Sequence, residues 1–303
     1  MNYNDILNIL CCPACKSSIY EEVDLNLSDN KLVCNNMHYY PIKCGIPDLR
    51  LNPETEFAAK NYAEIHREFE FDTDRKHTDI WIKKNGLNAS IINGKSVFVA
   101  GVGMGHELQC VDTFEPRMVV GIDYSDNIHR FPKLDVRNKG NTIYIQADIH
   151  NLPFKSNSFD FVFNGGVMQQ LRSPELGFRQ LYNVTRGGGI ISIGSIYDQS
   201  WGNRIISIAR WRHMFHKMQY DDAKKKIMRY GRISKLFGKF KLGIIPRSFI
   251  GEIRVVDSLG QMMDFYYPEY RHVIDPNEII QWFNDVGIKE VQKGERQFVG
   301  RKQ

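Results

Sequence analysis

The sequence lacks any long hydrophobic run. No segment of its 303 residues approaches the ~20 consecutive apolar residues that a membrane-spanning helix needs. The first residues are polar and acidic, and they do not show the pattern of a secretory signal peptide. These absences argue against a membrane protein, and we expect a cytoplasmic protein with no membrane partner.

The sequence also lacks a strong charge of one sign. Lys and Arg number 40 and Asp and Glu number 35, which gives a net charge of +5. So small an excess does not by itself require a nucleic-acid partner. Neither an internal repeat nor a low-complexity tract occurs, and the length allows one core domain with a small further unit.

Cysteine is scarce beyond residue 44. Of the six cysteines in the chain, only Cys110 lies there. In a cytoplasmic chain, five cysteines within 44 residues indicate a site and not a disulfide scaffold. Cys12 and Cys15 form a Cys-x-x-Cys knuckle, and Cys34 and His38 follow as a Cys-x-x-x-His pair. Two such pairs supply the four ligands of tetrahedral zinc.

We therefore predict a structural Zn²⁺ site held by Cys12, Cys15, Cys34 and His38. Cys44 is the alternative fourth ligand, and Cys11 is interpreted as a neighbour of the site. Two other interpretations stay open, which are a remnant that no longer binds metal and a redox pair.

A glycine-rich turn follows an apolar run in the middle of the chain. Residues 97–100 lead into Gly101, Gly103 and Gly105, and a helical stretch begins after them. A backbone without side chains lets a nucleotide-like ligand lie directly on the chain. The third glycine comes one residue early for the dinucleotide pattern, so a plain turn is the alternative.

Two further apolar runs end on acids. Residues 118–122 lead into Asp123, about 20 residues past the glycines, where a carboxylate can bind both ribose hydroxyls. A third run leads into Asp148. Later runs at 159–163 and 190–196, separated by helix-length segments, predict a parallel α/β sheet. Taken alone, Asp123 is also compatible with a solvated strand end, and Asp148 with a cap.

In this order the segments resemble the class I S-adenosylmethionine (SAM)-dependent methyltransferases with a type 11-like core, over roughly residues 95–200. Residues 147–154 are similar to the family's Ala-Asp-x-x-x-Leu-Pro-Phe segment. Residues 159–162 are similar to its Phe-Asp-x-Val strand, and residues 186–189 to its Pro-Gly-Gly turn. The resemblance implies a Rossmann-like, seven-stranded, mostly parallel sheet and methyl transfer from SAM.

The resemblance also implies cofactor contacts. Asp123 would bind the ribose, Asp148 would read the adenine amino group, and Ile149 would pack beside the base. Tyr62, which precedes the core, would also contact the cofactor. A plain packing role for Tyr62 is the alternative. The residues assigned to SAM are Gly101, Gly103, Gly105, Glu107, Asp123, Tyr124, Asp148, Ile149, Asn164 and Tyr62.

The chain departs from the family at two places. Gln169 and Gln170 stand where many relatives have two histidines, and Thr185 and Arg186 stand where Lys-Pro is usual. The first change removes an imidazole near the reacting methyl group. It keeps open the hypothesis of a scaffold protein that binds SAM without catalysis.

Residues 8–50 resemble the Trm112-like zinc ribbons, including the segment Tyr-Pro-Ile-Lys-Cys-Gly-Ile-Pro at 40–47. Relatives usually have Asp at the position of Cys44, which argues against Cys44 as a ligand. The segment also resembles the zinc finger fused to ribosomal RNA guanine methyltransferases. Because so small a ribbon buries little core, we expect the metal to supply its folding energy.

The expected organisation has five parts, with a last helix that starts after Asp275 and a hairpin over 288–301. The fourth part is a lid rich in Lys, Arg and aromatic residues. Its charges indicate either an anionic acceptor or solvated helix faces. The parts are a zinc ribbon (1–52), a helical linker that covers the cofactor (53–92), a SAM-binding core (93–198), a helical lid (199–250) and a C-terminal completion (251–303).

The favoured function is methyl transfer to an O or N atom of a small-molecule acceptor. Residues 264–272 resemble the tail of a methyltransferase group with small-molecule acceptors. We expect Tyr267, Tyr270, Arg271 and His272 to face the acceptor. The candidate catalytic residues are His272, Tyr267, Tyr270 and Gln170, and His272 is the candidate general base because its intrinsic pKa is near neutral. A solvent-facing role for His272 is the alternative.

The second hypothesis is an RNA methyltransferase in which the ribbon positions RNA. It predicts a basic face shared by ribbon and lid. Acidic residues in the ribbon, at Glu21, Glu22, Asp24 and Asp29, argue against it. The oligomeric state stays undetermined at the level of sequence.

Overall fold

The computed structural model describes residues 4–51, 57–68, 79–80, 82–83, 85–103, 105–130, 142–194, 211–239, 259–294 and 297–303. Among the helices in these ranges, none has the length and apolar composition required to traverse a bilayer. The predicted lid residues 199–210 and 240–250, and the linker residues 53–56, 69–78, 81 and 84, lie outside the described part.

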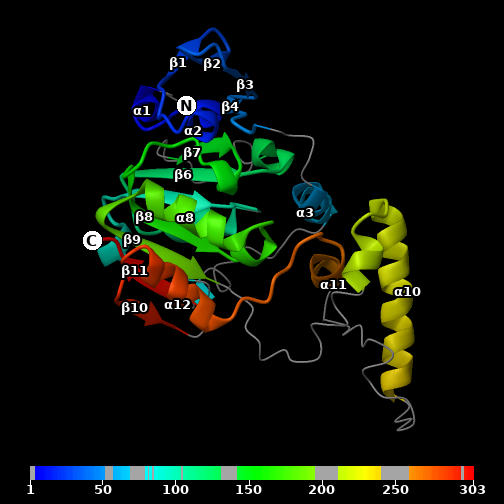
Figure 1. The fold of residues 1–303 in the computed structure, drawn as a ribbon. Coiled ribbons are helices and arrows are strands. Elements are labelled where there is room, and N and C mark those ends of the chain that lie inside the picture. The colour runs from blue at the N-terminus through cyan, green and yellow to red at the C-terminus, as the bar shows by residue number, and fades with distance from the viewer. Residues whose placement is uncertain are drawn as a thin grey trace.

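A seven-stranded sheet forms the centre of the molecule (Figure 1). Its order is β10-β11-β9-β8-β5-β6-β7, in which β5 to β9 are parallel and β11 is antiparallel to β9. The predicted mostly parallel sheet is thus confirmed. The strands are β5 (Ser96–Ala100), β6 (Met118–Asp123), β7 (Thr142–Gln146), β8 (Phe159–Gly165), β9 (Thr185–Gly194), β10 (Val291–Lys293) and β11 (Gln297–Arg301).

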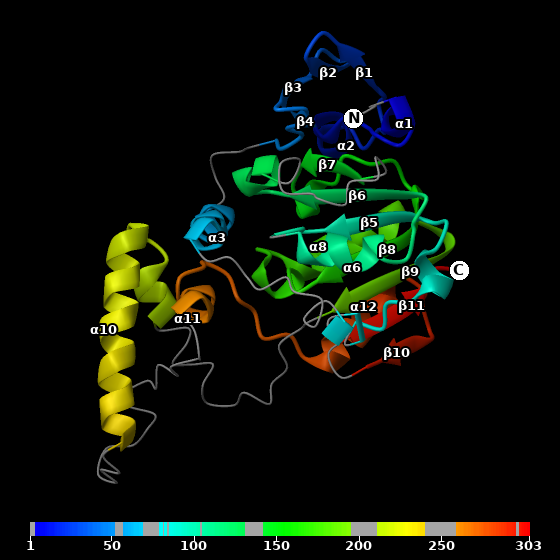
Figure 2. The ribbon, with the colours of Figure 1, turned by 180° about the vertical axis from the view of Figure 1, so that it is seen from behind.

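Helices cover both faces of this sheet, which is why its strands are apolar on both sides. In β5, Phe98 and Ala100 belong to the cluster that includes α8 (Pro174–Val184) and α12 (Pro276–Asp285). The alternate residues Val97 and Val99 pack with α6 (His106–Asp112) and α5 (Ala89–Ile92). Figures 1 and 2 show α8 and α12 on one face and α6 on the other.

The last helix starts where the sequence predicts. Asp275 is the N-cap of α12, and its Oδ1 accepts a hydrogen bond from Asn277 N at 2.7 Å. Pro276 occupies the first turn, where a missing N–H costs nothing. The strands β10 and β11 that follow form the predicted hairpin.

The direction of chain travel reverses beside β5. Its neighbours are β6 on one side and β8 on the other, so the chain passes to β6 and β7 and then returns to β8. In open α/β sheets, ligands bind at the carboxyl ends of the strands where such a reversal occurs. The turn that contains Gly101 begins directly after β5, at this point.

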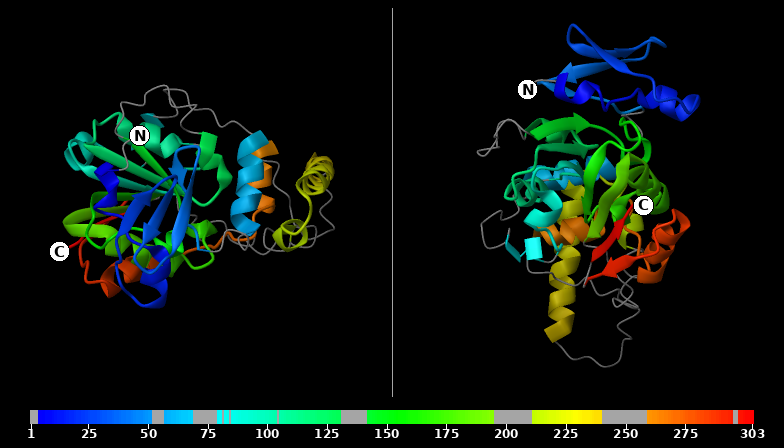
Figure 3. Two further views of the ribbon diagram at one scale, coloured as in Figure 1. Left: turned by 90° about the horizontal axis from the view of Figure 1, so that it is seen from above. Right: turned by 90° about the vertical axis from the view of Figure 1, so that its left-hand side faces the viewer.

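The N-terminal ribbon is a small four-stranded antiparallel unit beside β7 (Figures 1 and 3). It shares one hydrophobic cluster with the core, in which Ile6 and Leu10 pack together with Phe98 and Phe154. Lys16 Nζ also donates to Phe154 O at 2.6 Å. The ribbon elements are α1 (Asn4–Leu7), α2 (Pro13–Ser18), β1 (Leu25–Ser28), β2 (Lys31–Cys34), β3 (Tyr39–Lys43) and β4 (Ile46–Pro47).

A third group of helices lies beside the carboxyl ends of the strands. Here α3 (Phe57–Glu68), α11 (Leu259–Tyr266) and α10 (Tyr220–Lys239) share a separate apolar cluster that includes Ile65, Phe215 and Met263. Figures 1 and 3 place α3 next to the sheet and α10 beyond α11. The described part of the predicted lid therefore packs as an outer helical layer.

Candidate functional site

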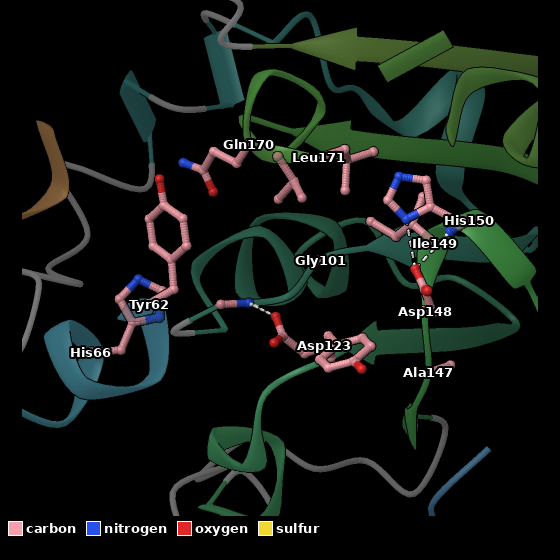
Figure 4. A pocket seen from close by; sticks show the side chains of 13 residues that line it. Tyr62, His66, Gly101, Asp123, Ala147, Asp148, Ile149, His150, Gln170 and Leu171 are labelled. Carbon is pink, nitrogen blue, oxygen red and sulfur yellow. Dashed lines mark hydrogen bonds and ion pairs between the residues drawn. The ribbon is translucent and has the colours of Figure 1, made fainter. Parts of the chain in front are cut away.

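The carboxyl ends of β5, β6 and β7 open onto a pocket of about 690 Å³, part of which is open to solvent (Figure 4). It is lined by Tyr62, His66, Gly101, Gly103, Asp123, Tyr124, Ala147, Asp148, Ile149, His150, Val167, Gln170 and Leu171. The sequence-predicted residues among them are Tyr62, Gly101, Gly103, Asp123, Tyr124, Asp148, Ile149 and Gln170. No described residue of the predicted lid is in this lining.

The glycine turn needs glycine for two reasons. Gly101, Gly103 and Gly105 have φ angles of +80°, +50° and +83°, in the region that L side chains rarely adopt. In addition, a Cβ at Gly101 would lie 2.5 Å from Val167 Cγ2. The backbone thus approaches the pocket closely, and Gly105 serves as the N-cap of α6.

Asp123 is fixed at the end of β6 by two backbone donors. Gly103 N donates to Oδ2 at 2.8 Å, and Ser125 N donates to Oδ1 at 2.9 Å. Each carboxylate oxygen has a further lone pair with which it can accept from a ligand hydroxyl. The site thus presents an oriented acceptor pair directly beside the glycine turn.

Asp148 is oriented by the histidine two residues later. Its Oδ1 accepts from His150 N and from His150 Nδ1, each at 2.8 Å. His150 Nε2 in turn accepts from Ser173 N at 3.1 Å. Because Nε2 accepts a backbone N–H, Nδ1 is the nitrogen that donates to Asp148. His150 therefore holds the Asp148 carboxylate at the pocket wall.

The opposite end of the pocket is formed by Tyr62 and His66 of α3 and by Gln170 of the 3-10 turn η3 (Met168–Gln170) (Figure 4). The Tyr62 and His66 rings lie 6.0 Å apart. Burial lowers the pKa of His66, although the carboxylates of Asp123 and Asp264 act in the other direction. His66 therefore favours its neutral form and can accept a proton or a hydrogen bond.

Glu107 lies in the first turn of α6, next to the pocket but not in its lining. Burial raises the pKa of its carboxyl group to about 8, and the Asp123 carboxylate adds to this effect. A carboxyl group in this position is poised to be ionised by a nearby cation. Its assignment to SAM stays a prediction.

Asn164 is not among the residues that line the pocket, and its assignment to the cofactor stays a prediction. Its side chain is fully buried, and Nδ2 donates to Ala100 O at 3.0 Å. Its Oδ1 accepts from Met168 N at 3.2 Å. These bonds tie the end of β5 to the turn that carries Gln170, so the amide is used within the protein.

Tyr267 is also placed differently from the prediction. It is buried, and its hydroxyl lies 3.0 Å from Glu64 Oε2 and 3.1 Å from Met218 O as a donor. Burial and the Glu64 carboxylate raise its pKa, so the phenol stays protonated. Tyr267 therefore holds α3 and the end of α11 together and does not line the pocket.

Tyr270 and His272 form a stacked pair outside the pocket lining. Their ring centroids are 6.2 Å apart and their planes differ by 6°. His272 N donates to Gln169 O at 2.6 Å, which places the pair behind the turn that bears Gln170. Of the four predicted catalytic residues, Gln170 alone is among the residues that line the described pocket.

The predicted metal ligands meet in the ribbon. The candidate ligand atoms of Cys12, Cys15, Cys34 and His38 all lie within 4.8 Å of one another. Cys15 Sγ is 3.9 Å from Cys34 Sγ, and both are 3.4 Å from His38 Nδ1. Tetrahedral zinc with its usual bond lengths separates ligand atoms by about 3.5–3.8 Å. The donor set and its spacing therefore fit a closed zinc site.

The fourth candidate ligand in this cluster is His38. Cys44 is exposed and does not belong to the cluster, although it was the sequence-level alternative. The neighbours of the sulfurs are typical of a supported site, because Tyr40 OH lies 3.1 Å from Cys12 Sγ and Asn36 Nδ2 donates to Cys15 Sγ at 3.2 Å.

Sequence reasoning missed His66 and His150 as pocket residues. His66 follows Tyr62 by four positions, so a helix that places Tyr62 at the pocket also places His66 there. His150 lies in the segment 147–154, two residues after Asp148, which the sequence identifies as a cofactor residue. The sequence therefore contained a signal for both histidines. Val167 and Leu171 also line the pocket, but their positions depend on the path of the turn around η3.

Residues 99–193 match a family model described as a methyltransferase domain. This range contains the glycine turn, Asp123, Asp148 and the turn with Gln170. This part of the chain is therefore similar to a methyltransferase domain.

Curated proteins match this chain over part of their length. A demethylmenaquinone methyltransferase of Staphylococcus haemolyticus is 30% identical over 73 residues, 24% of this chain and 30% of that protein. A chloroplastic 2-methyl-6-phytyl-1,4-hydroquinone methyltransferase 2 of Oryza sativa is 26% identical over 132 residues, 42% of this chain and 37% of that protein. The chain thus spans about a third of the length of these relatives.

Solved structures resemble the fold as well. A SAM-dependent methyltransferase from Aquifex aeolicus matches with a TM-score of 0.41 at 14% sequence identity, covering 77% of this chain and 98% of that one.

Proposed function

We propose that this chain, on the strength of its similarity to a methyltransferase domain, transfers a methyl group from SAM to an O or N nucleophile of a small-molecule acceptor. The single observation that carries the proposal is the convergence of the glycine turn, Asp123 and Asp148 on one pocket. These residues stand far apart in sequence and match the cofactor motifs in order.

The pocket has the features that SAM requires. The backbone of Gly101 and Gly103 forms one wall without side chains. Asp123 offers acceptors for two hydroxyls, and Asp148 offers an acceptor for an amino group beside the apolar Ile149. These residues would hold the nucleoside, while the glycine turn and Glu107 would hold the methionine part.

SAM, when bound, supplies an activated methyl group because its sulfonium is already a good leaving group. The protein has mainly to align the acceptor and to exclude water. Tyr62, His66 and Gln170 stand at the end of the pocket away from Asp148 and are the residues placed to do so. Among them, the neutral imidazole of His66 is suited to receive a proton from the acceptor.

A small-molecule acceptor is favoured by two further observations. The two relatives above are named for demethylmenaquinone and for a phytyl hydroquinone, both small molecules. Moreover, Lys224 of the described lid forms an ion pair with Glu68, so this charge is already neutralised within the protein. We also propose that the ribbon cluster holds structural Zn²⁺.

The test is incubation of the purified protein with methyl-labelled SAM and a fractionated extract of the source organism. We expect the label in the small-metabolite fraction, and ribonuclease treatment should leave the amount of this label unchanged. Label that sediments with RNA and is released by ribonuclease would replace the proposed function with RNA methylation. SAM binding without label in any fraction would replace it with a non-catalytic role.

A further inference from the structure

The chain leaves the ribbon along the free edge of the central sheet. Asp48 forms a parallel bridge with Gln146 at the end of β7, and Leu49 N donates to Gln146 O at 2.8 Å. The segment after β4 thus continues the sheet beyond its last strand. It delivers Arg50, a residue of the ribbon, to the carboxyl ends of β6 and β7.

Arg50 contacts one pocket residue in two ways. Its Nη1 donates to the carbonyl oxygen of Tyr124 at 3.0 Å, and its guanidinium carbon lies 5.2 Å from the centroid of the Tyr124 ring. Tyr124 lines the pocket and follows Asp123 directly. Backbone and ring of Tyr124 are therefore both held by a side chain from outside the region that is similar to a methyltransferase domain.

The guanidinium itself is fixed by an acid of the ribbon. Arg50 Nε donates to Asp48 Oδ1 at 2.8 Å, and Nη2 donates to Asp48 Oδ2 at 2.7 Å. Both side chains are less than a tenth exposed. Such a two-pronged pair sets the plane of the guanidinium, which a lysine ammonium cannot reproduce.

A core residue completes the arrangement from the other side. Gln146 Nε2 donates to the same Tyr124 carbonyl oxygen at 3.2 Å and to Asp126 Oδ1 at 2.8 Å. Arg50 Nη2 also lies 3.6 Å from Asp126 Oδ1. The backbone that carries Tyr124 is thus clamped between the ribbon and β7.

We propose that Arg50 is a positioning residue of the cofactor site, which acts through Tyr124 to orient the wall against which the nucleoside of SAM lies. The inference rests on the proposed function, since it takes the pocket to bind SAM. It adds that the ribbon supplies part of the cofactor site through one side chain, and that this side chain touches Tyr124 and not the ligand.

The experiment is calorimetric titration of the full chain with S-adenosylhomocysteine (SAH), the demethylated form of SAM. Arg50→Lys, which keeps the charge, and Arg50→Met, which removes it, should both weaken SAH binding by roughly 5- to 50-fold, in the range of couplings between neighbouring sites. Lys43→Met is the matched control. Lys43 Nζ pairs with the same Asp48 at 3.3 Å, but the Lys43 side chain is largely exposed and does not line the pocket. The affinity of the Lys43→Met protein for SAH should therefore equal that of the wild type.

A double-mutant cycle separates positioning from general damage. In a Tyr124→Leu background, Arg50→Lys should lose most of its effect on SAH affinity, because the aromatic ring that the guanidinium orients is gone and only the hydrogen bond to the backbone carbonyl oxygen of residue 124 remains. Metal content and melting temperature are measured on the same samples, and Arg50→Lys serves if Arg50→Met fails to fold.

Three results would count against the inference or its premise, and they are distinct. Wild-type affinity in a folded Arg50→Lys protein would overturn the role of Arg50. An equal loss with and without Tyr124 would show that Arg50 acts by another route, which also overturns it. A wild-type chain that binds no SAH would overturn the proposed function itself.

Discussion

The backbone N–H of Gly103 donates to Asp123 Oδ2 at 2.8 Å. The two residues are 20 positions apart, yet they meet because β5 and β6 are parallel neighbours whose carboxyl ends share one edge of the sheet. The glycine turn and the acid are therefore one structural unit. The carboxylate orients the turn, and the turn orients the carboxylate.

Substitution of Asp123 should disrupt this unit. Asp123→Ala removes the acceptor for ligand hydroxyls and leaves the N–H groups of Gly103 and Ser125 without their partner. We expect SAH affinity to fall by about 10- to 100-fold, as for the loss of hydrogen bonds to a charged group. Asp285→Ala, at an exposed acid of α12, is the control. Equal affinities for SAH would remove Asp123 from the site.

Metal analysis should identify the fourth ligand of the ribbon. Cys15→Ser and His38→Ala should each reduce bound zinc well below one ion per chain, whereas Cys44→Ser should retain it. The reason is that Cys44 stands outside the cluster of ligand atoms. The measurement is elemental mass spectrometry after dialysis. Retention of zinc by His38→Ala with loss in Cys44→Ser would reverse the assignment.

Glu107 should make stability depend on pH in a defined window. Its folded-state pKa of about 8 lies above the ordinary value of 4.5, so between these values the folded state holds a proton that the unfolded state has lost. Stability contributed by this group is therefore lost as pH rises towards 8. The melting temperature of Glu107→Gln relative to wild type should increase from pH 6.5 to pH 8.5.

The window above pH 6.5 avoids the opposite effect of His66. Burial lowers the pKa of that imidazole, so its contribution makes the protein less stable as pH falls below the ordinary value of 6.5. A constant difference between Glu107→Gln and wild type across pH 6.5–8.5 would contradict the raised pKa of Glu107.

Tyr267→Phe distinguishes packing from catalysis. The hydroxyl donates to Glu64 or Met218 inside the helical layer, so its loss should cost about 1 kcal/mol of stability, the net value of one hydrogen bond. SAH affinity and label transfer should stay at the wild-type level. Loss of label transfer without a change in melting temperature would return Tyr267 to the acceptor site.

The central part of the fold could be predicted because each of its signals is local. An apolar run that ends on glycine or on an acid identifies a buried strand and the residue at its carboxyl end. Parallel pairing then brings Gly101, Asp123 and Asp148 to one edge. The N-cap at Asp275 and the cysteine pairs of the ribbon are equally local, and the structure has them where the sequence indicates.

The acceptor side could not be predicted in the same way because its contacts are long-range. Tyr267 bonds to Glu64, which is 203 positions away, and Asn164 bonds to Ala100 across 64 positions. Nothing in the neighbourhood of either residue reveals such a partner. For the same reason Arg50 gave no signal, since its partner Tyr124 lies 74 positions further along the chain.

Titration of the purified chain with SAH, and in parallel with NAD, determines whether this pocket is a SAM site. One SAH should bind per chain, with an affinity in the micromolar range usual for cofactors, and NAD should give no measurable heat under the same conditions. Absence of SAH binding, or tighter binding of NAD, would contradict the assignment of this pocket to SAM.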